Sequence, residues 1–321
     1  MSVTVSGSPY LGSNQNPAYS GTFIPEIWSG KLIEKFYAST VLSVISNTDY
    51  EGEIKDKGDR VHIRQKPTIT VSDYQVNQAL AVQRPAAAIV DLTIDYAKYF
   101  NLVLDDVMEI QSDINLMSMW ADDAAEQMKI VIDTAVLLNI LNTPVAANSG
   151  ATAGAISSSI NLGTTAAPLA LVPRDASAGR VEILDLITRL GQTLDEQNIP
   201  ETGRWITLPA WAAQYLKQSD LRQASISGDS ASTLRTGRLG MIDRFTLYTS
   251  NLLPNGVAGG LSAGEWVIYA GHPHALTFAS QVTKLETLRS EQTFGTLLRG
   301  LQVYGFKVLD GKALVQAIVT P

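Results

Sequence analysis

Two half-exposed strand patterns between residues 51 and 95 constrain this chain more than any other feature. Val61 and Ile63 alternate with basic side chains, and Leu92 and Ile94 alternate with acids and a threonine. A period of two predicts strands that bury one face only. If the strands pair as a hairpin, each side has about 20 residues and reaches about 65 Å at about 3.3 Å per residue.

An arm of that length cannot be folded into its own subunit, because a compact chain of this size has a radius of gyration of only about 20 Å. The arm therefore has to lie on another molecule, and a second copy of the chain is the simplest candidate. Exposed ion pairs contribute about 0–1 kcal/mol each, so they would set the register of this contact more than its strength. Candidates for pairing with a neighbour's acids are Arg60, Arg64, Lys66 and Arg84.

The arm is followed by a long amphipathic helix, predicted over residues 106–142. Asp106 and Glu109 form a capping-box pattern at its start, where acids also suit the helix dipole. A line of apolar residues with the helical period predicts the buried face. This line is Ile110, Ile114, Met117, Ala121, Ala124, Met128, Ile132 and Ala135. Four acids are predicted on the opposite face: Asp122, Asp123, Glu126 and Asp133.

The negative charge of the chain is concentrated in this helix. The net charge is −7, and residues 101–150 carry one base, Lys129, against eight acids. The simpler interpretation is a helix face exposed to water. The alternative is a face that looks onto a polyanion to which it must not bind, because a basic face would hold DNA phosphates strongly.

Composition argues against several classes of protein. The chain has 321 residues, 45% hydrophobic and 17% charged, which is enough for a sizeable core and for two domains. It has no cysteine, so disulfides, thiol nucleophiles and Cys metal sites are excluded. Residues 1–17 lack a signal-peptide pattern, and no apolar stretch reaches the roughly 20 residues of a membrane span. A soluble protein made in the cytoplasm is expected.

The rest of the chain predicts a mixture of helices and strands without the rhythm of a doubly wound sheet. Residues 143–178 are small and polar and predict a long surface loop, with room for a short hairpin, at a domain boundary. Asp310-Gly311 is a hairpin signal. Helices are predicted at about 181–199 and 209–217, and strands at 204–208, 245–250, 265–270, 293–309 and 312–319.

Patterns that carry chemistry are weak. His272 and His274 flank Pro273 and could touch a metal, but no carboxylate or Cys completes a site, so a turn is favoured. The glycine-rich basic stretch 235–240 follows a polar loop and not a strand, which argues against a dinucleotide site. We therefore expect no catalytic residue, no metal and no cofactor.

A series of motifs, taken in order, resembles the major capsid proteins of tailed double-stranded DNA bacteriophages, which share the HK97-type fold. Each motif is short, but together they run from about residue 20 to residue 318. They are Phe23-Ile-Pro-Glu-Ile-Trp28, Lys57-Gly-Asp-Arg-Val61, the stretch 95–106 before the long helix, Gly240-Met-Ile-Asp-Arg-Phe245, Ser250-Asn-Leu-Leu-Pro254, Phe278-Ala-Ser-Gln281 and Phe294-Gly295.

The resemblance implies an α+β, HK97-like capsid fold with an N-terminal arm, an extended β-hairpin loop, a long spine helix, and peripheral and axial domains. The implied parts are the N-terminal arm at 1–20, a leading helix region at 21–50, the extended loop at 51–100, an axial domain at 201–270, and a peripheral domain at 101–200 and 271–321 that holds the spine helix.

The resemblance also implies a structural protein and not an enzyme. Copies would assemble into pentamers and hexamers that close an icosahedral head around double-stranded DNA, in the host cytoplasm and without a membrane. The acids of the spine helix would face the packaged DNA, whose contacts are non-specific. Implied partners are further copies of the chain, a separate scaffolding protein, a portal protein and an optional decoration or cement protein. The alternatives are an encapsulin-like cellular shell and a soluble enzyme without a recognisable motif.

Overall fold

The computed structural model describes residues 37–50, 60–67, 69–111, 116–174, 179–219, 240–256, 258–291 and 293–321. All of them belong to one compact unit, Tyr37–Pro321, which is distinct from a unit of Met1–Phe36. The predicted N-terminal arm, most of the leading region and the first residues of the predicted hairpin therefore lie outside the described residues.

The predicted hairpin is present. Strands β1 (Arg60–Arg64) and β2 (Ile89–Thr93) pair antiparallel, with Arg60 opposite Thr93 and Arg64 opposite Ile89. Ile63 and Leu92 are buried, whereas the alternate residues of β1 are exposed. This pattern is the one-sided burial that the period of two predicts.

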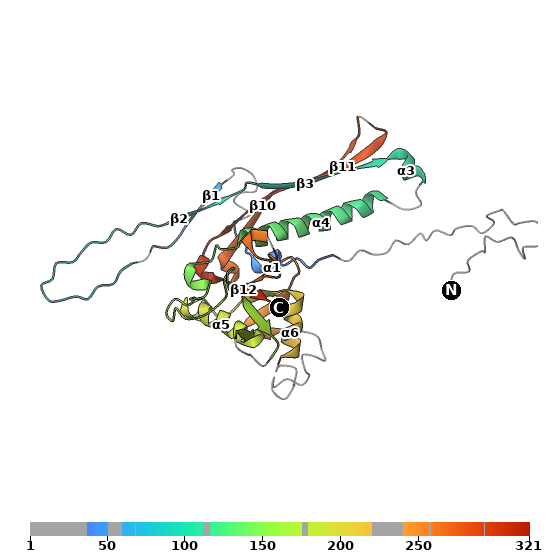
Figure 1. Cartoon of the computed structure of the whole chain (residues 1–321). Coiled ribbons are helices and arrows are strands. Elements are labelled where there is room, and N and C mark those ends of the chain that lie inside the picture. The colour runs from blue at the N-terminus through green and yellow to red at the C-terminus, as the bar shows by residue number, and fades with distance from the viewer. Residues whose placement is uncertain are drawn as a thin grey trace, which may run out of the picture. The chain divides into compact units, whose positions relative to one another are not determined.

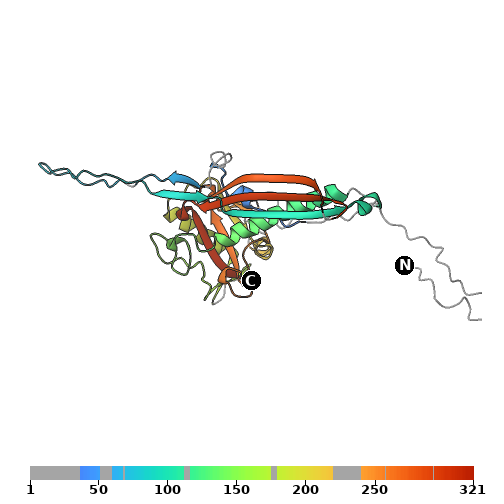
Figure 2. The same ribbon diagram turned by 90° about the horizontal axis from the view of Figure 1, so that it is seen from above.

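The hairpin continues past these strands as an extended arm, described over residues 65–67 and 69–88, which projects from the body in Figures 1 and 2. A tight turn at Val76-Asn77 closes it, and Asn77 has a positive φ, 69°, which asparagine adopts more readily than most residues. Three sets of contacts follow the register of β1 and β2 out to this turn. Gln65 N donates to Ala88 O at 2.8 Å, and Gln78 N donates to Gln75 O at 3.0 Å. Between them, the side-chain amide of Gln83 accepts the Thr70 N–H at 3.2 Å and donates to Thr70 O at 2.6 Å.

A three-stranded antiparallel sheet forms the next layer. Its order is β10 (Leu276–Arg289), β11 (Gly295–Val308) and β3 (Tyr96–Asp105). The helix α4 (Leu116–Asn139) runs along one face of this sheet, beneath β3 in the view of Figure 1. The sequence predicts the strand that becomes β11, whereas β10 is suggested only by the resemblance.

The long predicted helix is corrected in detail. Helical residues are α3 (Asp106–Gln111) and α4, while residues 112–115 lie outside the description, and the chain turns after Asn139 instead of continuing to residue 142. The predicted apolar line is wrong at Ile110, which is 84% exposed. The physical reason is that α3 buries no residue at all, so the face predicted to enter the core has nothing to pack on in the described chain.

A seven-stranded mixed sheet forms the other half of the body, in the order β5-β4-β12-β9-β6-β8-β7. Its core lies under the helices α5 (Ile183–Glu196) and α6 (Ala210–Gln218). The strands are β4 (Leu169–Val172), β5 (Arg180–Glu182), β6 (Arg204–Leu208), β7 (Met241–Ile242), β8 (Phe245–Thr249), β9 (Trp266–Gly271) and β12 (Leu314–Thr320). The predicted strands at 204–208, 245–250, 265–270 and 312–319 are confirmed to within two residues at each end.

Two predictions for this half are wrong. Residues 143–174 are not a plain surface loop, because they supply β4 and bury Ala153, Ile160 and Leu162 in the core. The short hairpin allowed for in this stretch does have a counterpart, since Ala153 and Ile160 pair antiparallel. Asp310-Gly311 does not make a hairpin, since β11 and β12 belong to different sheets. The Asp310 carboxylate instead accepts the backbone N–H of Lys312 at 2.9 Å. This turn leads the chain from one sheet to the other.

The two sheets share a core around the C-terminal half of α4. Ile132 and Val136 of α4, Tyr269 of β9 and Tyr304 of β11 are buried in one cluster with the short helix α1 (Leu42–Ile45). The predicted limits of the peripheral and axial domains stay a prediction. The seven-stranded sheet does place β12, predicted as peripheral, beside β9, predicted as axial.

Candidate functional site

The base of the hairpin shows how its apolar face is used. Ile63 and Leu92 are buried against Ala279 and Leu309, and Val303 of β11 packs against the same cluster. The fit is tight, since a Cβ added at Gly305 would lie 2.2 Å from the carbonyl oxygen of Thr93. The hairpin base therefore covers one end of the three-stranded sheet.

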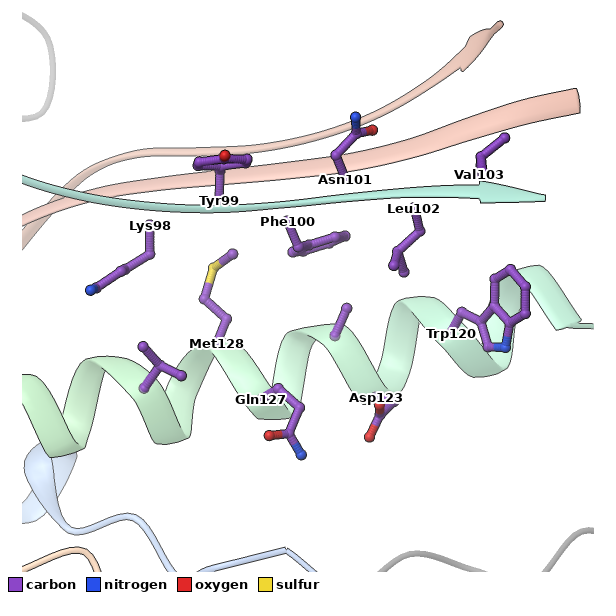
Figure 3. Close-up of a pocket in the computed structure, with 12 residues that line it drawn as sticks. Lys98, Tyr99, Phe100, Asn101, Leu102, Val103, Trp120, Asp123, Gln127 and Met128 are labelled. Carbon is purple, nitrogen blue, oxygen red and sulfur yellow. The ribbon is translucent and has the colours of Figure 1, made fainter. Parts of the chain in front are cut away.

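The covered side of the sheet is the side turned away from α4. Figure 3 shows Phe100 and Leu102 pointing toward the helix, and Tyr99, Asn101 and Val103 pointing away from it. Leu301 lies opposite Tyr99 in the ladder, and Val303 lies opposite Ala97, so both share the side of Tyr99. The hairpin base thus rests on the side of the sheet opposite α4.

Beyond the hairpin base this side of the sheet is uncovered in the described chain, and we name the uncovered part the open face. It combines apolar and charged residues. Tyr99 is 80% exposed and Val103 is 50% exposed. The open face consists of Tyr99, Val103, Leu288 and Leu301 together with Lys284, Glu286 and Arg299. Glu286 lies 3.5 Å from the ammonium of Lys284 and 3.7 Å from the guanidinium of Arg299.

The arm carries a second uncovered apolar surface. Side chains alternate along extended strands, so residues an even number of positions from Ile63 or Leu92 share their side of the hairpin. That side continues outward as Ile69, Val71, Leu80 and Val82, which we name the apolar arm face, with exposures of 67%, 92%, 76% and 87%. Asp73 and Arg84 fall on the same side. Apolar side chains like those that pack at the hairpin base therefore recur along the arm, where the body of the same subunit does not cover them.

The four basic residues predicted at a subunit contact are all exposed. Arg60 lies 3.8 Å from Asp91 in its own hairpin, and His62 Nδ1 lies 2.7 Å from the same carboxylate. Arg84 lies toward the base of the apolar arm face, and Lys66 lies on the other side of the arm. Their contact with a neighbour stays a prediction.

Three of the four predicted acids of the spine helix lie at or near the surface. Asp122 is exposed. Asp123 is half-buried and accepts the Tyr37 hydroxyl at 2.8 Å, and Glu126 accepts the Lys129 ammonium at 2.5 Å. Their predicted position toward DNA is not tested by this arrangement.

Asp133 contradicts the predicted exposed face, because it is only 1% exposed. Its Oδ2 accepts the backbone N–H of Val41 at 2.7 Å. Burial raises the pKa of Asp133 to about 6, although hydrogen bonds from the Val41 and Leu42 amides act to lower it. The reason for the error is that α4 has a second packing surface, made by chain that lies about ninety positions earlier.

A groove of about 710 Å³ separates β3 from α4 (Figure 3). Phe100 and Leu102 line it from the strand, and Trp120 and Met128 line it from the helix. Lys98 and Asp123 add one charge of each sign. The sequence indicates an amphipathic helix but not which strand lies beside it, so it does not predict this groove.

The structure explains one of the weak sequence motifs, the pair of histidines at 272 and 274. The Nδ1 of His272 accepts the backbone N–H of His274 at 3.2 Å, within the turn Pro273–Ala275. The turn interpretation of these histidines is therefore confirmed. Within the described residues, no group of three or more His, Cys, Asp or Glu side chains could hold a metal ion, and none of the helices is long and apolar enough to cross a bilayer.

Comparisons with known proteins point in one direction. A family model described as phage capsid protein matches residues 92–317. The solved structure from Mycobacterium phage Che8 is 28% identical, with a TM-score of 0.73 over 92% of this chain and 96% of that chain. The capsid of cyanophage P-SCSP1u is 16% identical, with a TM-score of 0.67 over 92% of each chain.

The mature capsid of bacteriophage PhiM1 is also 16% identical, with a TM-score of 0.64 over 92% of this chain and 91% of that chain. No curated protein matches the chain. The likeness to these structures confirms the predicted α+β, HK97-like fold.

Proposed function

This chain belongs to the phage capsid protein family, and from that premise we propose that copies hold one another by laying the arm of one on the open face of the next. The protein is a major capsid protein, and copies of it form the shell of a phage head. The observation that carries the proposal is the continuation of the packed side of the hairpin, with the same register and the same residue types, beyond the body of the subunit.

The apolar arm face needs a cover. Ile69, Val71, Leu80 and Val82 are each at least two-thirds exposed, and residues 65–88 contain only three charged residues, Lys66, Asp73 and Arg84. Fully burying one side chain of this size contributes about 1.5–3 kcal/mol. A contiguous exposed apolar surface on a soluble protein commonly marks an interface.

The open face matches the arm in chemistry. Its aromatic and aliphatic side chains can meet the apolar arm face, and its two cations flank only one carboxylate. The carboxylate of Asp73, near the arm tip, is therefore attracted to Lys284 and Arg299. Arg84, at the other end of the arm face, can pair with Glu286. Such exposed pairs add about 0–1 kcal/mol each and favour one register over others.

The geometry of the subunit supports a contact between copies and not within one. At the hairpin base the same kind of packing, strand pair on sheet, is made inside the chain. In Figures 1 and 2 the arm leaves this base in one direction, while β3, β10 and β11, the strands that carry the open face, extend in the other. An arm cannot bend back onto its own open face without breaking its register, but an adjacent copy can present that face to it.

The remaining parts of the proposal follow from the family. Copies form pentamers and hexamers of an icosahedral shell that encloses double-stranded DNA, with a separate scaffolding protein, a portal protein and an optional decoration protein as partners. Assembly takes place in the host cytoplasm. The role is structural and not catalytic. The acids Asp122, Asp123 and Glu126 face the DNA, where like charge keeps the packaged genome from adhering.

The absence of cysteine allows a direct cross-linking test. Two single variants, Val82→Cys and Tyr99→Cys, are mixed, assembled and oxidised under mild conditions. We expect disulfide-linked dimers on a non-reducing gel, because the two thiols then belong to different copies. The matched control is Ala81→Cys with Tyr99→Cys, since Ala81 is also exposed but lies on the opposite side of the arm.

The outcomes separate the two levels of the proposal. Equal cross-linking by Ala81→Cys, or cross-linking of Val82→Cys to Lys98→Cys in the groove instead, contradicts docking on the open face. Electron microscopy of the same samples tests shell formation independently. Nucleic acid in native particles distinguishes a phage head from a cargo compartment.

A further inference from the structure

Residues 37–47, which we name the lead segment, hold α4 against both sheets. Val41, Leu42 and Ile45 are buried in the cluster that contains Ile132 and Val136. The polar contacts of the segment reach each part of this core. They include the Tyr37 hydroxyl to Asp123 at 2.8 Å, Val41 N to Asp133 Oδ2 at 2.7 Å, the Ser250 hydroxyl to Ser39 O at 2.8 Å, Asn47 N to Leu276 O at 2.9 Å and Phe278 N to Asn47 O at 2.9 Å.

One of these contacts depends on a buried carboxylate. Asp133 is 1% exposed, and while its Oδ2 accepts the Val41 N–H, its Oδ1 is buried without a hydrogen-bond partner among the described residues. Buried carboxylates are normally paired with a cation, because an ionised group in an apolar surrounding is costly. Here the surrounding cluster is aliphatic and aromatic.

The ionisable groups around Asp133 do not compensate its charge. The lead segment brings Tyr37, which donates to Asp123. On α4, Lys129 is paired with Glu126 at 2.5 Å. From the sheet side the same cluster brings Tyr269, which donates its hydroxyl to Leu137 O, and Tyr304, which is buried. None of these groups contributes to the pKa of Asp133, which burial alone raises.

We propose that Asp133 is a proton-controlled clasp, which holds the lead segment on α4 more firmly when it is protonated than when it is ionised. The neutral carboxyl group keeps a carbonyl oxygen for the Val41 N–H, and it removes an uncompensated charge from the core. The clasp lies within the subunit body, so it goes beyond arm docking and its test does not depend on that contact.

The direction of the pH dependence follows from linkage. Because burial raises the pKa of Asp133 from 3.8 to about 6, the folded segment binds the proton more tightly than the opened one. The extra hold is complete below the ordinary pKa and is lost as the pH rises through about 6. The hold should therefore strengthen by about tenfold, as an opening equilibrium, when the pH falls from 8 to 5.

Hydrogen exchange measured by mass spectrometry tests the clasp in assembled particles of the full chain. Exchange of peptides covering residues 37–47, corrected for the intrinsic pH dependence of exchange, is compared between pH 5 and pH 8. We expect the corrected exchange of these peptides to be about tenfold slower at pH 5 than at pH 8 in the native protein, because the opening equilibrium is less favourable there. In Asp133→Asn the corrected exchange should be the same at both pH values. The matched control Asp123→Asn removes a carboxylate of the same helix, keeps an acceptor oxygen for the Tyr37 hydroxyl, and should keep the step.

The proposal is overturned if the native protein shows no step in these peptides, or if Asp133→Asn keeps it. Should Asp133→Asn fail to fold, the native and Asp123→Asn profiles still decide, because a flat profile in both contradicts a clasp. If peptides from α5 show the same pH step, the change is a global loss of stability and not a local opening of the lead segment, and this result also contradicts the proposal.

Discussion

Gly305 is the residue that fixes how closely the hairpin base approaches its sheet. A methyl group at this position would lie 2.2 Å from Thr93 O and close to Ile94, both on backbone that cannot move aside cheaply. We expect Gly305→Ala to lower the free energy of unfolding by about 1–3 kcal/mol, as overpacking does, measured by denaturant unfolding.

Gly300→Ala is the matched control for this prediction. Its added Cβ would also be crowded, but by the ring of Phe100, a side chain that lines the groove and can rotate. We expect the smaller loss of stability there. Equal losses of stability in the two variants would contradict the view that the backbone of the hairpin base leaves no room for a side chain at residue 305.

Glu196 makes a pH-dependent contact of the opposite sign to Asp133. Hydrogen bonds from the Ile156 and Ser157 amides, at 2.8 and 3.0 Å, hold the pKa of Glu196 down to about 2. The contact therefore stabilises residues 154–158 at pH values above 4.5 and is lost as the pH falls toward 2. Hydrogen exchange in this turn should accelerate in Glu196→Gln at neutral pH, and unchanged protection would contradict the assignment.

Asp122 and Asp133 show why residue environments were only partly predictable. Both fall among the acids of one helix, and helical spacing alone assigns them the same exposed face. The lead segment, about ninety positions earlier, then buries Asp133 and leaves Asp122 exposed. A contact between segments so distant in sequence leaves no periodic signal in either of them.

At the scale of single elements, the proposed repulsion between the acids of α4 and DNA can be tested directly. If Asp122, Asp123 and Glu126 repel the packaged genome, changing them to Asn or Gln should shorten the length of DNA packaged per particle. Sequencing or gel sizing of DNA from purified particles measures this. Neutralising Glu291, an exposed acid outside α4, serves as the control, and equal genome length in all variants would contradict the proposal.

The arm is the element whose removal should separate folding from assembly. Residues 69–84 bury nothing within the subunit, so replacing them with a two-residue turn should leave the unfolding free energy of the body nearly unchanged. Shell formation should be lost, as seen by electron microscopy and sedimentation. Normal shells from the shortened chain would contradict a role of the arm in closure.

Elements with a clear period were predictable, and elements defined by distant contacts were not. The alternation around Ile63 and Leu92 and the helical line around Met128 and Ile132 predict β1, β2 and α4. Strand β4 is not predicted, because its four apolar residues are too few to show a period and they stand in a stretch that is otherwise rich in small and polar residues. The groove and the open face depend on the order β10-β11-β3, which no local pattern records.

At the scale of the whole molecule, many modest contacts must add up to a closed shell. If each subunit gives one arm and receives another, as we propose, a small loss at one contact is repeated around the particle. We expect the double change Val71→Ser with Val82→Ser to lower the denaturant concentration at which particles fall apart, measured by light scattering. Ala81→Ser, on the other side of the arm, should leave it unchanged.

The register of the hairpin is the same at its base, where Arg60 lies opposite Thr93, and at its tip, where Gln78 N donates to Gln75 O. This register restricts how the length of the arm can change in evolution. Inserting two residues in each strand lengthens the arm by about 7 Å and keeps the apolar arm face on the same side. Inserting one residue in each strand moves the apolar side chains beyond the insertion to the opposite side of the arm. Larger or smaller particles built on this plan should therefore differ by paired steps in this arm.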